Sequence, residues 1–261
     1  MTNASSKYRR LNEAQILATQ QRLRDRITER FPDSGLSRVA SELLSLSTET
    51  TALAVYLGSP HWPLRIVTGL AIAAIVVVLI SIVGTLQLAP GIDGLDELVQ
   101  ATDAAIGTLA FLGAVVFFLV TLETRLKRRK ALATLHQLRS VAHIVDMHQL
   151  TKDPERLSMP QPDTASSPAR LLSSMELGRY LDYCSELLSV ITKLAALHVQ
   201  YFNDPVTLAA VNDVESLASG LSNKIWQKIT LLDQVRGVSR RAASRPGSVA
   251  AGAAAEADGE L

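Results

Sequence analysis

The chain is poor in residues that cross-link a fold or build β-structure. It has one cysteine in 261 residues, Cys184, so no disulfide can form within the chain. Phe, Trp and Tyr together make up only 5% of it, and strand-like alternation is sparse outside two long apolar runs. Opposite charges nearly cancel to a net +1, so no global field attracts nucleic acid, and we expect no nucleic-acid partner. These absences favour an all-helical protein.

The sequence also lacks the motifs that mark enzymes. It has no Gly-rich phosphate loop before a helix, no GxSxG, no HExxH and no kinase set. The most metal-like group is His136, His143, Asp146 and His148. His143 and Asp146, three residues apart, could share a metal. On one straight helix His136 lies two turns, about 10 Å, from His143, and His148 points to another face. We therefore expect a polar helix surface here, with no metal, no cofactor and no catalytic residue.

Two apolar runs are long enough to cross a membrane. Residues 66–86 and 104–122 contain no ionisable side chain. The first run would rise about 31 Å as a helix, which matches a hydrocarbon core of about 30 Å. Backbone groups in lipid need internal hydrogen bonds, so both runs are predicted to be helical. The predicted spans are 64–88 and 104–124, joined by a loop at 89–103.

Flanking charges predict the orientation of the spans. The loop is acidic, with Asp93, Asp96, Glu97 and Asp103 and no Lys or Arg. The second run is followed by a basic run, Arg125, Lys127, Arg128, Arg129 and Lys130. Basic flanks stay on the cytoplasmic side, so we expect an outward loop and both termini in the cytoplasm, in the inner (plasma) membrane. The same basic run is a candidate contact for anionic lipid headgroups. Within the loop, apolar residues at helical spacing predict a short helix on the outer membrane surface (Ile92, Leu95, Leu98 and Val99).

Before the first span the pattern predicts two cytoplasmic helices within residues 1–63. Residues 8–31 have one apolar stripe with Ile16, Leu23 and Ile27. The next helix carries a heptad seam, the spacing that keeps two helices in contact: Leu36, Val39, Leu43, Leu46, Thr50, Leu53 and Leu57.

After the second span, residues 125–235 are predicted to complete a cytoplasmic bundle. One unbroken helix is expected over 104–150, then a Pro-rich linker at 151–168. The next helix is expected to begin with Ser167 as its N-cap and Pro168 as its first residue. Its two adjacent seams run through Tyr180, Tyr183, Leu187, Val190, Leu194, Leu197 and Tyr201, and through Leu177, Leu181, Cys184, Leu188, Ile191, Ala195, His198 and Phe202. So wide an apolar face predicts the central helix of the bundle, with a buried thiol and a core histidine.

The last helix is predicted to begin at Pro205 with Asp204 as its cap. Its apolar stripe contains Val211, Val214, Ala218, Leu221, Ile225 and Leu232. Residues 236–261 are rich in Ala, Gly, Ser and Arg without periodicity, and are predicted to be a disordered tail.

Small and weakly polar residues follow one stripe of each span. They are Ala71, Ala74, Ser81 and Thr85 in the first, and Gly107, Ala110 and Ala114 in the second. Such residues let membrane helices approach closely, so packing between spans is the main interpretation. The alternative is the lining of a narrow pore in an oligomer.

No specific motif identifies a family. The architecture of residues 64–150, a two-span hairpin leading into a long cytoplasmic helix, resembles the two-span effectors of bacterial nucleotide-signalled defence systems. That resemblance implies assembly in the membrane and transfers no residues.

Together these patterns predict an all-α membrane protein, a two-span hairpin with a cytoplasmic bundle formed by the N- and C-terminal segments. The expected function is a non-enzymatic, self-associating scaffold or interaction module, motivated by a surplus of heptad seams. The alternative is an oligomeric channel or pore-forming effector gated by its cytoplasmic domain. Membrane lipids, further copies of the chain and a cytoplasmic protein are the expected partners.

Overall fold

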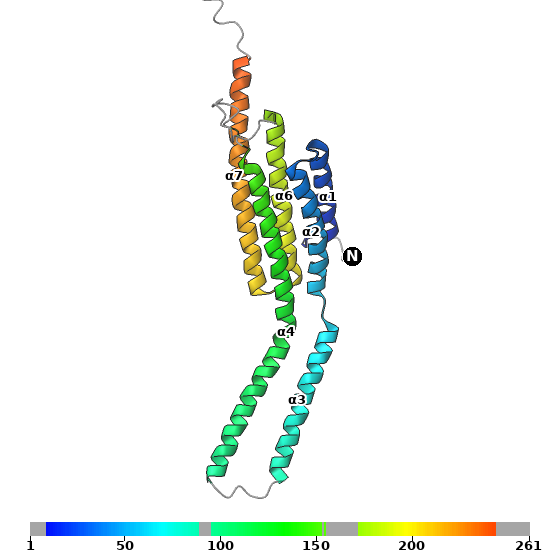
Figure 1. Ribbon diagram of the computed structural model, residues 1–261, viewed down its shortest axis with the longest axis vertical. Helices are drawn as coiled ribbons and strands as arrows, with labels where there is room; N and C mark the ends of the chain where they lie inside the picture. Colours follow the sequence, from blue (N-terminus) through cyan, green and yellow to red (C-terminus); the bar gives the residue numbers. More distant parts are fainter. Residues whose placement is uncertain (1–8, 89–94, 153, 155–171, 244–261) are drawn as a thin grey trace, which may run out of the picture.

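The computed structural model describes residues 9–88, 95–152, 154 and 172–243, and the regular structure in these ranges is helical. The helices are α1 (Glu13–Arg30), α2 (Gly35–Gly58), α3 (Trp62–Leu88), α4 (Leu95–Leu150), α6 (Ser174–Tyr201) and α7 (Pro205–Ala243). They form two regions (Figure 1). A five-helix bundle contains α1, α2, the second half of α4, α6 and α7, and a hairpin of α3 and the first half of α4 extends from one end of it.

Helix α6 is the centre of the bundle, as its two seams predict. It contacts α1, α2, α4 and α7. All members of both seams are buried except Tyr201 and Phe202, which are half-buried at the end of the helix. A helix with an apolar face this wide can bury it only between neighbours on several sides.

The other predicted stripes are buried inside the same bundle. The seam of α2 is buried except for half-buried Leu53, and the stripes of α1 and α7 are buried throughout. In the second half of α4, residues at the same three- and four-residue spacing are also buried: Leu135, Leu138, Ala142 and Val145. The heptad seams, which the sequence pattern suggested to be more numerous than one bundle needs, are therefore buried within the bundle of a single chain.

The helix boundaries differ from the predicted ones at several places. Asn12 caps α1, which begins five residues later than expected. Ser173 and Glu176 form a capping box at the start of α6, so Ser167 is not the cap of this helix; residues 155–171, with most of the predicted linker, lie outside the described residues. Helix α7 continues through Ala243, so residues 236–243 of the predicted tail are helical, and residues 244–261 are not described.

Helix α4 joins the two regions. It is one helix of 56 residues, about 84 Å long, and it serves first the hairpin and then the bundle. It begins at Leu95, so Leu98 and Val99 belong to it and do not form a separate surface helix. Residues 95–103 contain no Pro or Gly, and nothing in the chain stops the helix between the predicted loop and the span.

The hairpin buries little of its apolar surface. Helices α3 and α4 contain windows with mean hydropathies of 2.5 and 2.4, and none of either window is buried inside the molecule. Both helices are thus long and apolar enough to cross a membrane. They run side by side away from the bundle (Figure 1).

Candidate functional site

The most elaborate polar site lies where the hairpin meets the bundle. Helix α2 ends at Gly58, and Pro60 separates it from α3. A helix break exposes backbone groups that need partners. Two side chains of α4, one turn apart, supply them: Lys127 Nζ donates to the Ser59 carbonyl at 2.7 Å, and Glu123 Oε1 accepts from the His61 amide at 3.3 Å.

Glu123 is the hub of these contacts. Its carboxylate accepts from Arg65 Nε of α3 at 2.8 Å and lies 3.0 Å from Lys127 Nζ. The side chains of Glu123 and Lys127 are only 17% and 9% exposed, so water screens this pair weakly. The start of α3 is thereby fastened to α4 by charge-assisted hydrogen bonds.

Arg128, on the same turn of α4, holds the connection between α6 and α7. Its guanidinium binds both carboxylate oxygens of Asp204, with Nε at 3.1 and 3.0 Å and Nη2 at 2.6 Å. Asp204 is 3% exposed and also accepts from the amide and hydroxyl of Thr207, which confirms it as the cap of α7. Burial opposes ionisation of Asp204, but hydrogen bonds from Arg128 and Thr207 outweigh it, so its pKa is lowered.

We define Arg65, Glu123, Lys127, Arg128 and Asp204 as the junction cluster. Its carboxylates are paired with cations, and these five residues include neither a nucleophile nor a free base. The arrangement is suited to holding helices in position. Sequence reasoning did not find this cluster. The available signal was Glu123 four residues before Lys127, a spacing that pairs charges on a helix.

The junction changes the interpretation of the basic run. Lys127 and Arg128 are committed to the cluster, and Lys130 donates to the Tyr56 hydroxyl at 3.1 Å, with its Nζ 4.4 Å from the ring centroid. Arg125 and Arg129 are exposed. The guanidinium of Arg125 lies over the Phe118 ring at 5.3 Å. Contact with lipid headgroups thus stays a prediction, centred on Arg125 and Arg129.

The small residues of the spans do not form the contact between α3 and α4. Half-buried aliphatic side chains face that contact instead: Ile72, Ile75 and Leu79 of α3, and Leu112, Val115, Val116 and Leu119 of α4. Ala71 is half-buried beside them, whereas Ala74, Ser81, Gly107, Ala110 and Ala114 are exposed. The side chain of Thr85 is outside the described part of the structure. The small residues of α4 therefore point away from its partner helix.

The His and Asp side chains of the segment 136–148 of α4 do not come together in one site. Within the described residues no group of three or more His, Cys, Asp or Glu could hold a metal ion. Asp146 accepts from Gln149 at 2.6 Å, and His148 packs against Gly35 at the start of α2. Burial, with Arg38 and Lys152 nearby, lowers the pKa of His148.

Cys184 and His198 lie in the core of the bundle, where their seams place them. Burial raises the pKa of the Cys184 thiol to about 12, which leaves it a protonated thiol. His198 is fully buried, its Nδ1 lies 3.2 Å from the Leu194 carbonyl, and burial lowers its pKa.

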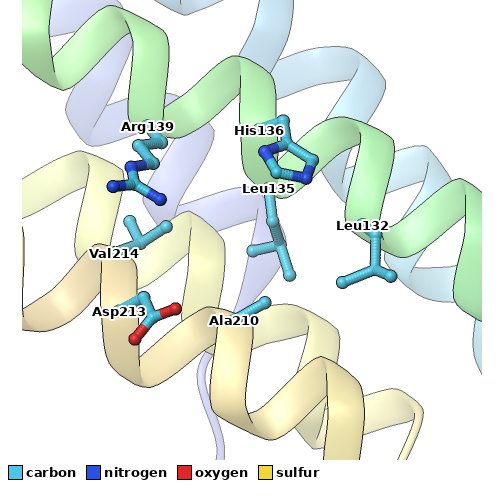
Figure 2. Close-up of a pocket in the computed structure, with 7 residues that line it drawn as sticks. All are labelled: Leu132, Leu135, His136, Arg139, Ala210, Asp213 and Val214. Carbon is cyan, nitrogen blue, oxygen red and sulfur yellow. The ribbon is translucent and has the colours of Figure 1, made fainter.

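The bundle surface is hollowed at several places, one of them between α4 and α7 (Figure 2). That cavity has a volume of about 40 Å³, with Arg139 and Asp213 at one end and Leu132 at the other. This is space for about one water molecule. Two larger hollows, of about 480 and 320 Å³, are open grooves between α2 and α4 and between α6 and α7. Both grooves are open to solvent, whereas ligand pockets are normally clefts or cavities that enclose most of the ligand.

The chain matches no protein-family model, and comparisons with curated proteins and with solved structures gave no match either.

Proposed function

We propose that the chain is a membrane-anchored, non-enzymatic interaction module that self-associates through its spans. In this proposal α3 and the first half of α4 cross the inner membrane, and the bundle stands in the cytoplasm. The observation that carries it is the exposed apolar surface of the hairpin, where Leu70, Ile80 and Phe111 are 67%, 66% and 69% exposed. So continuous an apolar surface is not stable in water, whereas lipid or a second apolar helix covers it without cost.

The outward face of α4 supports self-association. Gly107, Ala110 and Ala114 recur every three or four residues and are exposed together. A side chain added at Gly107 would meet no atom of the chain within 4 Å. Membrane helices associate through small residues because their backbones can then come close. Since the heptad seams are buried within one bundle, the spans are the better candidate for contact between copies.

The oligomeric state in nanodiscs or detergent tests this proposal. Wild-type protein should form a defined oligomer, and Gly107→Leu combined with Ala110→Leu should shift it to the monomer. The matched control is Leu109→Phe, which changes bulk at a residue that is 61% exposed on the same turn. Native mass spectrometry would measure all three proteins. A monomeric wild type, or an unchanged oligomer in the double variant, contradicts self-association through this face.

Labelling tests the orientation. Cysteines placed at 91–97 should react with an impermeant reagent added outside the cell, and a reporter fused after Leu261 should be active only in the cytoplasm. Protection of the loop from outside would overturn the topology without bearing on oligomerisation.

A second candidate function is an oligomeric pore. It is favoured by Ser81, whose exposed side chain is one of the few polar groups on the spans and donates to the Val77 carbonyl of its own helix. In a pore lined by Ser81, the Ser81→Asp variant would hydrate an apolar constriction and raise cation current across a planar bilayer. In a scaffold, the same carboxylate lies in lipid or a packed interface, so insertion should fall and no current should appear.

A further inference from the structure

The turn between α6 and α7 exposes apolar side chains at the end of the bundle nearest the hairpin. Val206 and Leu208, in the first turn of α7, are 44% and 41% exposed, and Phe202 is half-buried before them. Figure 1 shows α7 running away from the hairpin from its first residue. Side chains of a helix lean toward its N-terminus, so Val206 and Leu208 lean toward the hairpin.

The position of this turn follows from its tie to α4. The apolar run of α4 ends at Leu122, and Arg128, which holds Asp204, is six residues further along. Six residues of helix rise about 9 Å. Each headgroup layer of a bilayer is roughly 5–8 Å thick outside the hydrocarbon. With the hydrocarbon edge at Leu122, the turn lies at the outer boundary of the headgroups, and its leaning side chains reach into them.

Charge on the same side of α4 matches this environment. Arg125 precedes Arg128 by three residues, so it lies on the same side of α4 and one turn nearer the spans. It is exposed, and its guanidinium rests on the ring of Phe118, a residue of the proposed span. Exposed apolar side chains together with a cation at the same membrane level are the pattern of an interfacial lipid contact.

We propose that the α6–α7 turn is a second membrane contact, in which Val206 and Leu208 enter the headgroup layer and Arg125 binds lipid phosphate. The occupant of this surface is the leaflet that the spans enter, and the inference rests on the proposed membrane insertion. It gives the turn a role that anchoring by the spans alone does not require.

Tryptophan fluorescence of the full chain in vesicles with bromine-labelled acyl chains tests this inference. The chain has two Trp residues, and both are exposed: Trp62 is 67% exposed at the start of α3, and Trp226 is 60% exposed far along α7. Three single-Trp proteins are compared. They are Trp226→Phe, Trp62→Phe, and both substitutions together with Val206→Trp; circular dichroism checks that each keeps its helical content.

Trp62 reports on insertion, Trp226 on the distant bundle surface, and the Val206→Trp protein on the turn. We expect loss of emission intensity by bromine quenching and a blue shift for Trp62 and for the Val206→Trp protein, with neither for Trp226. Quenching of Trp62 without quenching in the Val206→Trp protein overturns the second contact but leaves the proposed anchoring intact. An unquenched Trp62 refutes the proposed insertion itself.

Lipid charge tests the role of Arg125. Quenching in the Val206→Trp protein should be stronger in vesicles containing phosphatidylserine than in phosphatidylcholine alone. Adding Arg125→Gln should remove that difference, and Arg139→Gln, a change to an exposed arginine on the bundle part of α4, should keep it. A difference that survives Arg125→Gln excludes Arg125 as the headgroup ligand.

Discussion

The bundle and the hairpin contain the same apolar residue types, but the bundle buries them and the hairpin exposes them. Leu181, Leu187 and Leu188 of the bundle are fully buried, whereas Leu70 and Leu109 of the hairpin are 67% and 61% exposed. In the bundle, removal of apolar surface from water favours folding. In the hairpin that surface stays available to lipid. The environment of each region is therefore encoded by what lies between the apolar residues: charged and polar faces in the bundle, and almost none in the hairpin.

The space around individual glycines also differs between the bundle and the hairpin. A Cβ built on Gly58 of α2 would lie 2.8 Å from Tyr201 Cδ1, and one on Gly35 would lie 2.2 Å from His148 Cε1. At Gly69, Gly107 and Gly113 of the hairpin nothing lies within 4 Å. Gly35 and Gly58 thus permit close contacts within the bundle, while these three hairpin glycines leave room for contacts outside the chain.

Truncating one leucine in each region should give the largest difference. Leu188→Ala should lower the free energy of unfolding by about 2–5 kcal/mol, because it leaves a cavity in a close-packed core. Leu109→Ala removes an exposed side chain and should change it by less than about 0.5 kcal/mol. Denaturant unfolding in detergent, followed by circular dichroism, measures both. Similar losses for the two variants would show that the regions are not packed differently.

Adding one methyl group to a glycine in each region should have a smaller effect. Gly58→Ala should cost about 1 kcal/mol, because the new Cβ crowds the Tyr201 ring. Gly113→Ala should be neutral or stabilise by up to about 1 kcal/mol, since Ala is the better helix former. The same unfolding measurement applies. In a Tyr201→Ala background the cost of Gly58→Ala should vanish, and its persistence there would contradict the assigned contact.

The smallest effect should be a pH dependence confined to the bundle. Because burial lowers the pKa of His198 in the folded state, the unfolded chain binds a proton first as pH falls below about 6.5. Stability should therefore decline below that pH until the folded pKa is reached. His198→Leu should flatten this part of the unfolding profile between pH 7 and 5. An equally steep profile in the variant would assign the dependence to other groups, among them His148.

Periodicity predicted most of the helices because the apolar residues at helical spacing are the ones that each helix buries. The seams of α6 and the stripe at Val211, Val214 and Ala218 needed only local spacing to be recognised. Boundaries were less predictable. A disordered tail was predicted from residue 236 onward, yet α7 continues through Gly237 to Ala243, because an isolated Gly weakens a helix without ending it.

The junction cluster could not be predicted from the sequence, for a different reason. Arg128 and Asp204 are 76 residues apart and belong to no shared pattern. Each had a sufficient local explanation, Arg128 as a topology signal and Asp204 as a helix cap. Only the packing of α4 against the α6–α7 turn brings the two charges together.

Because α4 is one unbroken helix, the direction in which its span faces is fixed relative to the direction in which its bundle half faces. One residue inserted between Thr124 and Arg125 would turn the span by about 100° relative to the bundle, since a helix has about 3.6 residues per turn. Glu123 would then face away from Arg65 while Arg128 kept its hold on Asp204. Seven inserted residues would restore the facing to within about 20° but would lift the bundle about 10 Å from the hairpin. Because α4 is continuous, its length and helical turn set the distance and the relative facing of the two regions.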